Sequence, residues 1–516
     1  MRLKTFGTVV GAGACAMALA SGAALGDPKQ GLPTDYLVTP EVDGVPFCTI
    51  PVHHHKRSSW TNKRALTVLN EIESNDTIAT ANTFVLTEVD NAVNIHGTNT
   101  ANENDYFKVD LEKGDILGLA VLRDGGSFDP MITVYNPDQT VLMRNDDGVA
   151  GIFPLASPLP GGVVGQDSDA CIVIPETGTY FMRVHPWVSG AGTFSEGDYI
   201  LQARWFRSVY ESRPLGDKQF IWVDFTGPTI NAAALFGGNP SANLSPLSSF
   251  LPNWGLGPGD MNAVVNAIIT NMEQKFDALA VENPHFDYTL RNSHQHVLLP
   301  GTPDITRIII GGTIAELGVS TLGIAESIDP GNFDTTETGV VLLDLYSAPA
   351  PNVNSINSLV IDPSSSIIEA IGQVIGHTAA HEAGHTFGGW HTNNSNGTRN
   401  TMDSGGTTIQ TRAGVGPDGI FGTADDLGPS FFVPDFYASE GVGVTPFSVE
   451  NTDVRMAYAM SSSVCGADLN DDNAVDGADL GLLLGNWGNP GTTDFNGDGT
   501  TNGVDLGLLL GNWGDC

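Results

Sequence analysis

The chain has 516 residues, which is too long for one hydrophobic core and predicts roughly three or four domains. It carries 59 acidic against 22 basic residues, so its formal net charge of -37 disfavours binding to nucleic acid or to an anionic membrane. Such acidity is typical of extracellular, calcium-using or salt-adapted proteins, and it does not choose among them.

Residues 1–26 have the pattern of a secretory signal peptide. Two basic residues near the start precede an apolar run over residues 6–20, and small residues at 18–20 or 24–26 offer a cleavage site. Cys15 lacks the leucine-led sequence of a lipid-anchoring site, so a lipoprotein is the lesser alternative. No other stretch approaches the ~18 apolar residues of a membrane helix. We expect a secreted protein without a membrane span, either released or retained at the cell surface.

We interpret residues 27–70 as a propeptide or linker, because they begin rich in proline and show no clear periodicity. They contain the run His53-His54-His55, followed by the basic pair Lys56-Arg57. Three adjacent histidines can bind a metal ion, and the alternative is an ordinary solvated loop.

Short alternating strands separated by Gly, Asn and Asp turns are predicted over residues 71–206. Strands at this spacing indicate an antiparallel β-sandwich. The predicted strands cover residues 105–109, 116–122, 131–135, 178–184 and 197–201. Asp129, Asp146 and Asp147 follow or precede strands, where they either bind calcium or occupy exposed turns.

The Glu-x-Asn-Asp opening at residues 73–76 and the Asp-Tyr-Phe, Gly-Thr-Tyr and Gly-Asp-Tyr strands resemble the bacterial pre-peptidase C-terminal domain. That module usually follows a protease domain, and here it would precede one. The resemblance therefore implies a fold and leaves the role of the segment open.

Residues 216–462 predict an α+β lobe. Its first half has a strand at 219–225, an amphipathic helix at 260–279 and strands at 307–310 and 340–345. We expect strand 340–345 at the edge of its sheet above a cleft, where an extended peptide can add as a further strand.

A long helix is predicted after Pro363. Ser366 and Glu369 have capping-box spacing, and one stripe runs through positions 367, 371, 374, 378, 381 and 385. Gly372 and Gly376 weaken a helix by about 1 kcal/mol each, which indicates that another element packs closely there.

His381 and His385 project from one face of this helix because they are four residues apart, and Glu382 lies about 100° round from His381. Gly388 permits a left-handed turn that returns the chain with His391 as a third imidazole. Three neutral nitrogens with one open position are the ligand set of catalytic zinc. We expect Zn2+ on the three histidines and Glu382 as the general base.

The pattern HEAGHTFGGWH at residues 381–391 resembles, position for position, the zinc signature of the metzincin metalloproteases. The resemblance implies an endopeptidase with a protein or peptide substrate and a methionine turn beneath the imidazoles. Met402 fits that turn, and Met456 is the alternative. Some metzincins carry a tyrosine two residues after this methionine, where this chain has Ser404. His377 and His381 are also four residues apart, but no acidic residue follows His377, and the last histidine of the signature is absent from that spacing. We therefore interpret His377 as a structural histidine or as one that supports a ligand.

The C-terminal residues contain an internal repeat, in which residues 468–488 return as 494–514. Oxygen-bearing side chains stand where a hard calcium ion requires them in each loop. The predicted Ca2+ ligands are Asp468, Asn470, Asp472, Asp476 and Asp479, then Asp494, Asn496, Asp498, Asn502 and Asp505. We expect the helix after each loop to bury its leucines and tryptophan against its twin. A Gly/Asp loop at 416–426 either binds calcium or forms a plain turn.

This paired loop and helix over residues 465–516 resembles the type I dockerin domain, which also has Asp at the last loop position. The resemblance implies a cohesin-like partner on a scaffold or surface. The alternative is a purely structural module held together by calcium.

Four cysteines remain after removal of the signal peptide, in an oxidising compartment. Cys465 and Cys516 bracket the C-terminal module, so their disulfide is favoured and Cys48 is left to pair with Cys171. The alternative for Cys48 is a thiolate that binds zinc until a propeptide is removed.

We therefore predict a secreted multidomain zinc endopeptidase with an all-β sandwich, an α+β metzincin-like lobe and a small α calcium-binding repeat. Two other classes stay open. One is a non-catalytic surface adhesion or assembly protein, against which Glu382 counts because a structural zinc site has no use for a base. The other is a component of a polysaccharide-degrading complex, for which no paired carboxylates can be located.

Overall fold

The computed structural model describes most of the chain after the first 35 residues. The described residues are 36–38, 41–42, 45–51, 67–87, 90–100, 103–146, 153–154, 156–159, 167–187, 195–213, 217–299, 302, 304–393, 396–403, 408–432, 435–436, 447–462, 467–470, 474–491, 493–495 and 499–515. Several predictions concern positions outside them, namely the signal peptide, the run 53–55, Asp147, Ser404, Asp472, Asn496, Asp498, Cys465 and Cys516.

A seven-stranded sheet forms the centre of the α+β lobe. Its strands, in spatial order, are β1 (Tyr36–Val38), β4 (Cys48–Pro51), β20 (Gly323–Ala325), β21 (Thr338–Val341), β19 (Ile305–Ile310), β15 (Gln219–Asp224) and β18 (Tyr288–Asn292). The last four pair in parallel, whereas β20 is antiparallel to β21. The prediction of an edge strand at 340–345 is wrong, because the short strand β20 covers β21 and the N-terminal hairpin β1–β4 covers β20.

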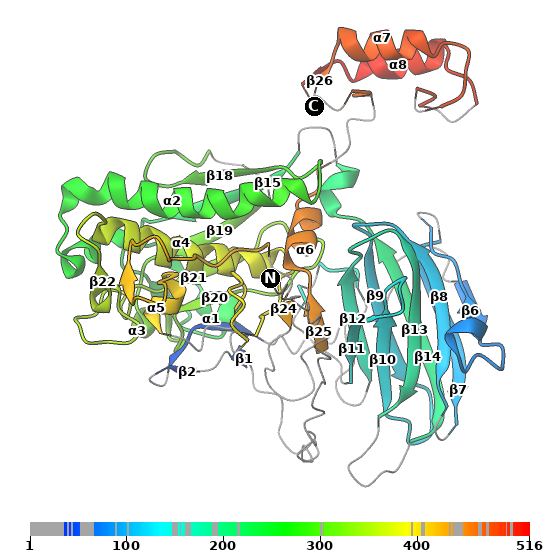
Figure 1. The fold of residues 1–516 in the computed structure, drawn as a ribbon, viewed down its shortest axis with the longest axis horizontal. Helices are drawn as coiled ribbons and strands as arrows, with labels where there is room; N and C mark the ends of the chain where they lie inside the picture. Colours follow the sequence, from blue (N-terminus) through cyan, green and yellow to red (C-terminus); the bar gives the residue numbers. More distant parts are fainter. Residues whose placement is uncertain are drawn as a thin grey trace, which may run out of the picture.

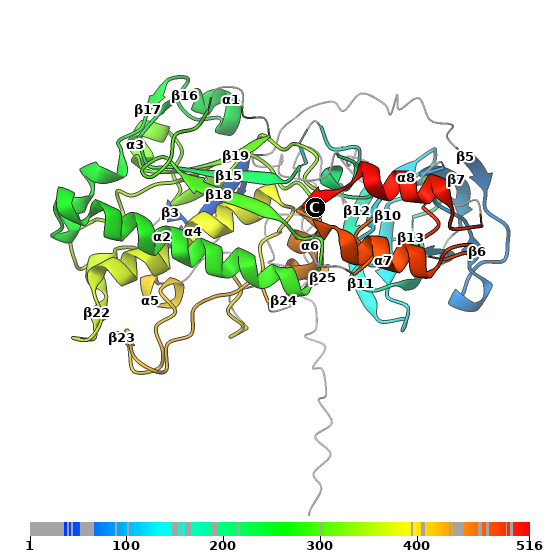
Figure 2. The ribbon, with the colours of Figure 1, turned by 90° about the horizontal axis from the view of Figure 1, so that it is seen from above.

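Helices α2 (Met261–Asp277) and α4 (Ile367–Thr386) lie side by side in both views of the ribbon (Figures 1 and 2). A Cβ at Gly372 would lie 2.6 Å from Cβ of Ala267, and a Cβ at Gly376 would lie 2.7 Å from Cβ of Asn271. The close packing predicted from the two glycines is therefore present, and it brings the two helix backbones together.

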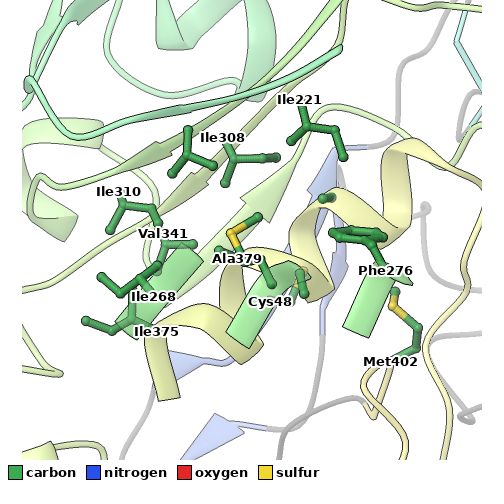
Figure 3. Close-up of a cluster of buried hydrophobic side chains, with 14 of the residues drawn as sticks. Cys48, Ile221, Ile268, Phe276, Ile308, Ile310, Val341, Ile375, Ala379 and Met402 are labelled. Atoms are coloured by element: carbon green, nitrogen blue, oxygen red, sulfur yellow. The ribbon is translucent and has the colours of Figure 1, made fainter. Parts of the chain in front are cut away.

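The hydrophobic core of the lobe lies between these helices and the sheet (Figure 3). Fully buried side chains fill it, including Ile308, Ile310, Val341, Ile268, Ile375 and Ala379. Burial of an aliphatic side chain of this size contributes roughly 1.5–3 kcal/mol. Cys48 from β4 is part of this cluster, so the N-terminal hairpin is packed into the core of the lobe.

The remaining short elements of the lobe and hairpin are β2 (Glu41–Val42), β3 (Val45–Pro46), β16 (Thr229–Ile230), β17 (Ala242–Asn243), β22 (Val360–Ile361), β23 (Ile420–Phe421), α1 (Ala232–Phe236), α3 (Ile314–Leu317), α5 (Ile409–Arg412) and α6 (Thr452–Ala459).

The predicted β-sandwich is present and consists of two sheets. One contains β12 (Ser168–Val173), β9 (Ile116–Arg123), β14 (Gly197–Phe206), β7 (Ala92–Asn99) and β5 (Thr67–Asn70). The other contains β11 (Val141–Asn145), β10 (Pro130–Tyr135), β13 (Gly178–Pro186), β8 (Asp105–Leu111) and β6 (Asn82–Thr83). In β8, Phe107, Val109 and Leu111 are buried and the residues between them are not, which is the alternation expected of a sandwich strand.

The sandwich and the lobe are joined more closely than their sequence boundaries predict. Two strands from the end of the lobe, β24 (Asp435–Phe436) and β25 (Phe447–Glu450), extend a sandwich sheet, since β25 pairs with β11 and β24 pairs with β25. The ring of Phe153 from the sandwich segment lies 6.4 Å from the ring of Trp390, edge to face. Ser208 Oγ donates a hydrogen bond to the carbonyl of Ala459 at 3.0 Å.

The C-terminal repeat forms two helices, α7 (Gly477–Gly485) and α8 (Gly503–Gly511), with β26 (Ala474–Val475) antiparallel to β27 (Gly514–Asp515). Only part of the predicted apolar face is buried. Leu483 and Leu509 are fully buried, but Trp487 and Trp513 are 46% and 49% exposed. Three successive leucines point about 100° apart on a helix, so a two-helix module can bury only one stripe of each. Within the described residues, no helix is long and apolar enough to cross a membrane.

Candidate metal centre

Helix α4 positions the first two histidines in its last turns. The Ser366 hydroxyl accepts a hydrogen bond from the Glu369 amide at 3.2 Å, and the Glu369 carboxylate accepts one from the Ser366 amide at 2.7 Å, as the capping-box spacing predicts. The chain then turns at Gly388, whose φ is 90°. A Cβ there would lie 2.5 Å from Cα of Pro330, so the turn needs glycine for both its angle and its space. This turn returns the chain with His391 towards the helix.

The three imidazoles converge through their Nε2 atoms. His385 Nε2 lies 3.1 Å from Nε2 of His381 and 3.1 Å from Nε2 of His391. The Nδ1 atoms of His381 and His385 each lie 2.7 Å from a backbone carbonyl, those of Thr401 and Gly389. A carbonyl only accepts, so each Nδ1 carries the proton and each Nε2 presents a lone pair. Burial lowers the pKa of His381 and His385, which keeps both rings neutral.

Cys48 completes a four-residue group with these histidines. Its Sγ lies 3.5 Å from His385 Nε2, and one ligand atom from each of the four residues lies within 4.8 Å of the others. Tetrahedral zinc with ordinary bond lengths separates two nitrogens by about 3.3 Å and nitrogen from sulfur by about 3.5 Å. The observed distances of 3.1 Å and 3.5 Å fit that geometry. The donor set is therefore suited to zinc.

Glu382 lies beside this group without belonging to it. The Cys48 thiol donates to Glu382 Oε2 at 3.2 Å, while Oε1 makes no hydrogen bond in the described part of the chain. Burial raises the pKa of the Glu382 carboxyl. A Cβ at Gly323 of β20 would lie 2.0 Å from Oε1, so this glycine makes room for the carboxylate. The role of Gly323 could not be predicted from the sequence, because nothing in the sequence near it indicates this contact.

The N-terminal hairpin covers the centre. Strand β4 pairs in parallel with β20, with Cys48 opposite Gly323. The Gly323 amide donates to the carbonyl of Phe47 at 2.8 Å. The Phe47 ring lies 4.9 Å from the ring of His381, edge to face. His381, Glu382 and His385 are fully buried as a result.

The predicted disulfide between Cys48 and Cys171 is not formed, since the structure has both residues as buried thiols. Cys48 is in the sheet of the lobe beside α4, whereas Cys171 is on β12 of the sandwich, opposite Gly118 of β9. The Cys48 sulfur instead lies with the three histidines, and the alternative assignment of this thiol as a zinc ligand stays a prediction.

Both candidate methionines pack beneath α4. A Cβ at Gly384 would lie 2.6 Å from Met402 Sδ and 2.7 Å from Met456 Cε. The backbone around Met402 also contacts the histidine segment, because the Thr401 carbonyl accepts from His381 and the Met402 carbonyl accepts from the amide of Thr392, next to His391, at 2.8 Å. His377 is buried four residues before His381 and stacks on Phe47 at 6.2 Å, so it lies beside the group of three histidines rather than within it.

The two C-terminal loops have matching hydrogen bonds. Asp479 accepts from the amides of Leu469 and Asp476 at 2.7 and 2.8 Å, and Asp505 accepts from those of Phe495 and Asn502, both at 2.8 Å. The side chains of Asp476 and Asn502 cap α7 and α8. Of the other predicted calcium ligands, the structure describes Asp468, Asn470 and Asp494.

Other acidic side chains form three groups in the part of the chain that the structure describes, and two of these groups share Glu73. The groups are Glu71 with Glu73 and Asp105, Glu73 with Asp76 and Glu103, and Asp418 with Asp425 and Asp426. The last belongs to the predicted Gly/Asp loop. Neither Asp129 nor Asp146 is in any of these groups, so the prediction of calcium at those strand ends gains no geometric support.

No protein-family model matches the chain, and no curated protein matches it. Many solved structures show a weak likeness to part of the chain, among them the following three. The PliG lysozyme inhibitor of Aeromonas hydrophila is 13% identical over 28% of this chain and 100% of its own, with a TM-score of 0.18. The pre-peptidase C-terminal domain of Bacillus anthracis collagenase is 13% identical over 24% of this chain and 94% of its own, with a TM-score of 0.17. CorA of Methylomicrobium album, a surface-associated copper-binding protein, is 12% identical over 24% of this chain and 97% of its own, with a TM-score of 0.17.

Proposed function

We propose that the chain is a secreted zinc endopeptidase of the metzincin type, made in a latent form. The observation that carries the proposal is the meeting of three Nε2 atoms, the Cys48 sulfur and the Glu382 carboxylate in one buried centre. A structural zinc site with four protein ligands has no use for an additional carboxylate beside it. Burial of a carboxyl oxygen that makes no hydrogen bond costs stability, and a catalytic role explains why it is retained.

His381, His385 and His391 would hold the zinc ion, and Cys48 would be the fourth ligand in the latent form. A bound zinc ion supplies a Lewis acid that lowers the pKa of water to about 7 and polarises a peptide carbonyl. Glu382 takes the proton of the attacking water and delivers it to the amide nitrogen as the C–N bond breaks. The carbonyls of Thr401 and Gly389 keep two of the rings oriented through both proton transfers.

The hairpin β1–β4 acts as the latch. Its Cys48 occupies the position that water and substrate need, and it also contacts the base. The hairpin precedes the sandwich in the sequence, so its removal by a cut in the segment before β5 leaves the sandwich attached to the lobe.

For the C-terminal module we propose Ca2+ in both loops and a cohesin-like partner. The matching hydrogen bonds of Asp479 and Asp505 support two equivalent loops. The half-exposed Trp487 and Trp513 offer apolar surface to a partner.

The experiment measures zinc in the purified full-length chain and its cleavage of an unfolded protein substrate before and after thiol modification by an organomercurial. We expect one zinc per chain, activity only after modification, and loss of that activity with a chelator. Cys48→Ala should be active without modification, whereas the matched variant Cys171→Ala should stay latent. A wild-type preparation that binds no zinc, or a Cys48→Ala variant that cleaves no substrate, would refute the proposal.

A further inference from the structure

Arg412, at the end of α5, is a buried cation beside the metal centre. It is 3% exposed. One Nη2 hydrogen bond reaches the side-chain oxygen of Asn354 at 2.6 Å, while Nε and Nη1 have no hydrogen-bond partner among the described residues. A guanidinium has five N–H donors, and buried donors without acceptors destabilise a protein. Burial lowers the pKa of Arg412, which reflects the same cost.

Phe47 of the latch covers this guanidinium. The Arg412 Cζ lies 5.2 Å from the centre of the Phe47 ring and 5.7 Å from that of the Tyr346 ring. The same Phe47 ring lies 4.9 Å from His381. Cation–π contact offsets part of the cost of burying Arg412, but it leaves Nε and Nη1 without acceptors among the described residues. Departure of Phe47 with the latch therefore opens a space, the size of an aromatic side chain, between a zinc ligand and an arginine.

We propose that this space is a substrate subsite that takes the carboxylate side chain of a glutamate or aspartate and pairs it with Arg412. The inference rests on the proposed peptidase function and adds a substrate class to it. An arginine N–H binds a carboxylate through a charge-assisted hydrogen bond. The Nε and Nη1 atoms of Arg412 have no acceptor in the part of the chain that the structure describes, so both can donate to a carboxylate that enters the space. The side chain of glutamate is closer in length to that of Phe47 than the side chain of aspartate is, so we expect glutamate to be preferred.

The register of the latch indicates which substrate residue enters the subsite. Strand β4 runs parallel to β20, with Cys48 opposite Gly323, so Phe47 lies beyond the N-terminal end of β20. An extended peptide forms the more stable ladder when it adds antiparallel. Its chain then runs from the zinc towards Arg412, and the residue in the place of Phe47 follows the scissile bond. We therefore expect cleavage on the N-terminal side of glutamate.

The test uses the full-length chain, activated by thiol modification, on peptides that differ at one residue. The set carries Glu, Gln, Asp, Asn or Leu at the variable position, each with a free or an amidated C-terminus, and mass spectrometry identifies the bond that is cut. We expect kcat/KM to be about 10- to 100-fold higher for Glu than for Gln, the range of a hydrogen bond to a charged group. Arg412→Gln should reduce this ratio to near 1, and Arg412→Lys should keep a smaller preference for Glu.

Arg399→Gln is the matched control, because Arg399 donates to the carbonyls of Leu427 and Val415 and its loss should leave the Glu/Gln ratio unchanged. Cleavage by the wild type without a preference for acidic residues would overturn the subsite and leave the peptidase proposal standing. A preference that persists in Arg412→Gln would overturn the role of Arg412. A requirement for a free C-terminus would show that a terminal carboxylate binds instead of a side chain. Failure of the activated wild type to cut any peptide or protein would overturn both proposals.

Discussion

Gly323→Ala tests the space that the structure reserves for Glu382, the proposed general base. The new Cβ would lie 2.0 Å from Glu382 Oε1, 2.7 Å from Cδ and 3.1 Å from Cγ. Atoms not bonded to each other do not approach this closely, so the carboxylate must move by about 1 Å or more, or β20 must shift. A displacement of about 1 Å in a catalytic group lowers the rate by roughly 10²-fold. Overpacking of the buried site should also cost about 1–3 kcal/mol of stability.

The assay compares thiol-activated cleavage, zinc content and thermal unfolding of Gly323→Ala with those of Gly259→Ala, where a new Cβ meets no atom within 4 Å. We expect Gly323→Ala to keep its zinc, because the added methyl group is directed at Glu382 and not at a histidine, and to lose activity. The control should match the wild type. Full activity and an unchanged unfolding temperature in Gly323→Ala would refute the placement of Glu382 against β20.

Two further predictions concern the surroundings of the site, and a third concerns the C-terminal repeat. Phe153→Ala should cost about 3–5 kcal/mol and speed the release of zinc to a chelator, because the edge-to-face contact with Trp390 beside His391 is lost; Phe153→Leu should restore slow release. Burial lowers the pKa of Lys275 from 10.5 to about 7, so the unfolded chain binds the extra proton between these pH values and the free energy of unfolding rises with pH across that window. Lys275→Met should flatten this rise when denaturant unfolding is compared at about pH 7 and about pH 9.5, and equal slopes would contradict the buried amine. Calorimetric titration of the full chain with Ca2+ should show about two fewer sites in the variant carrying both Asp479→Ala and Asp505→Ala, and an unchanged stoichiometry would argue against calcium in the repeat.

The elements set by local sequence were predicted well. The capping box of Ser366 and Glu369 predicted the start of α4, and Gly372 and Gly376 predicted that another element packs closely against this helix, which is α2. Alternation of apolar residues predicted the strands of the sandwich, because a half-buried sheet imposes that period on the chain. Spacing alone put His381 and His385 on one helix face, where the structure has them.

Contacts between distant segments could not be predicted in the same way. Cys48 lies 334 positions before Glu382, and no local pattern distinguishes a ligand from half of a disulfide. The place of β20 between β4 and β21 was not predicted, because a strand of three residues is too short to show a period. Gly323 and Arg412 acquire their roles only when β4 and α5 come together around α4, which requires the tertiary fold.

The central claim is that Glu382 acts as a base beside a zinc ion that it does not bind. The most direct measurement compares zinc content and cleavage of an unfolded protein by thiol-activated wild type, Glu382→Ala and His385→Ala. We predict that Glu382→Ala keeps its zinc and loses roughly 10²–10⁴ in rate, while His385→Ala loses the metal as well. Equal rates for wild type and Glu382→Ala, with zinc bound in both, would contradict the peptidase account and favour a structural metal site.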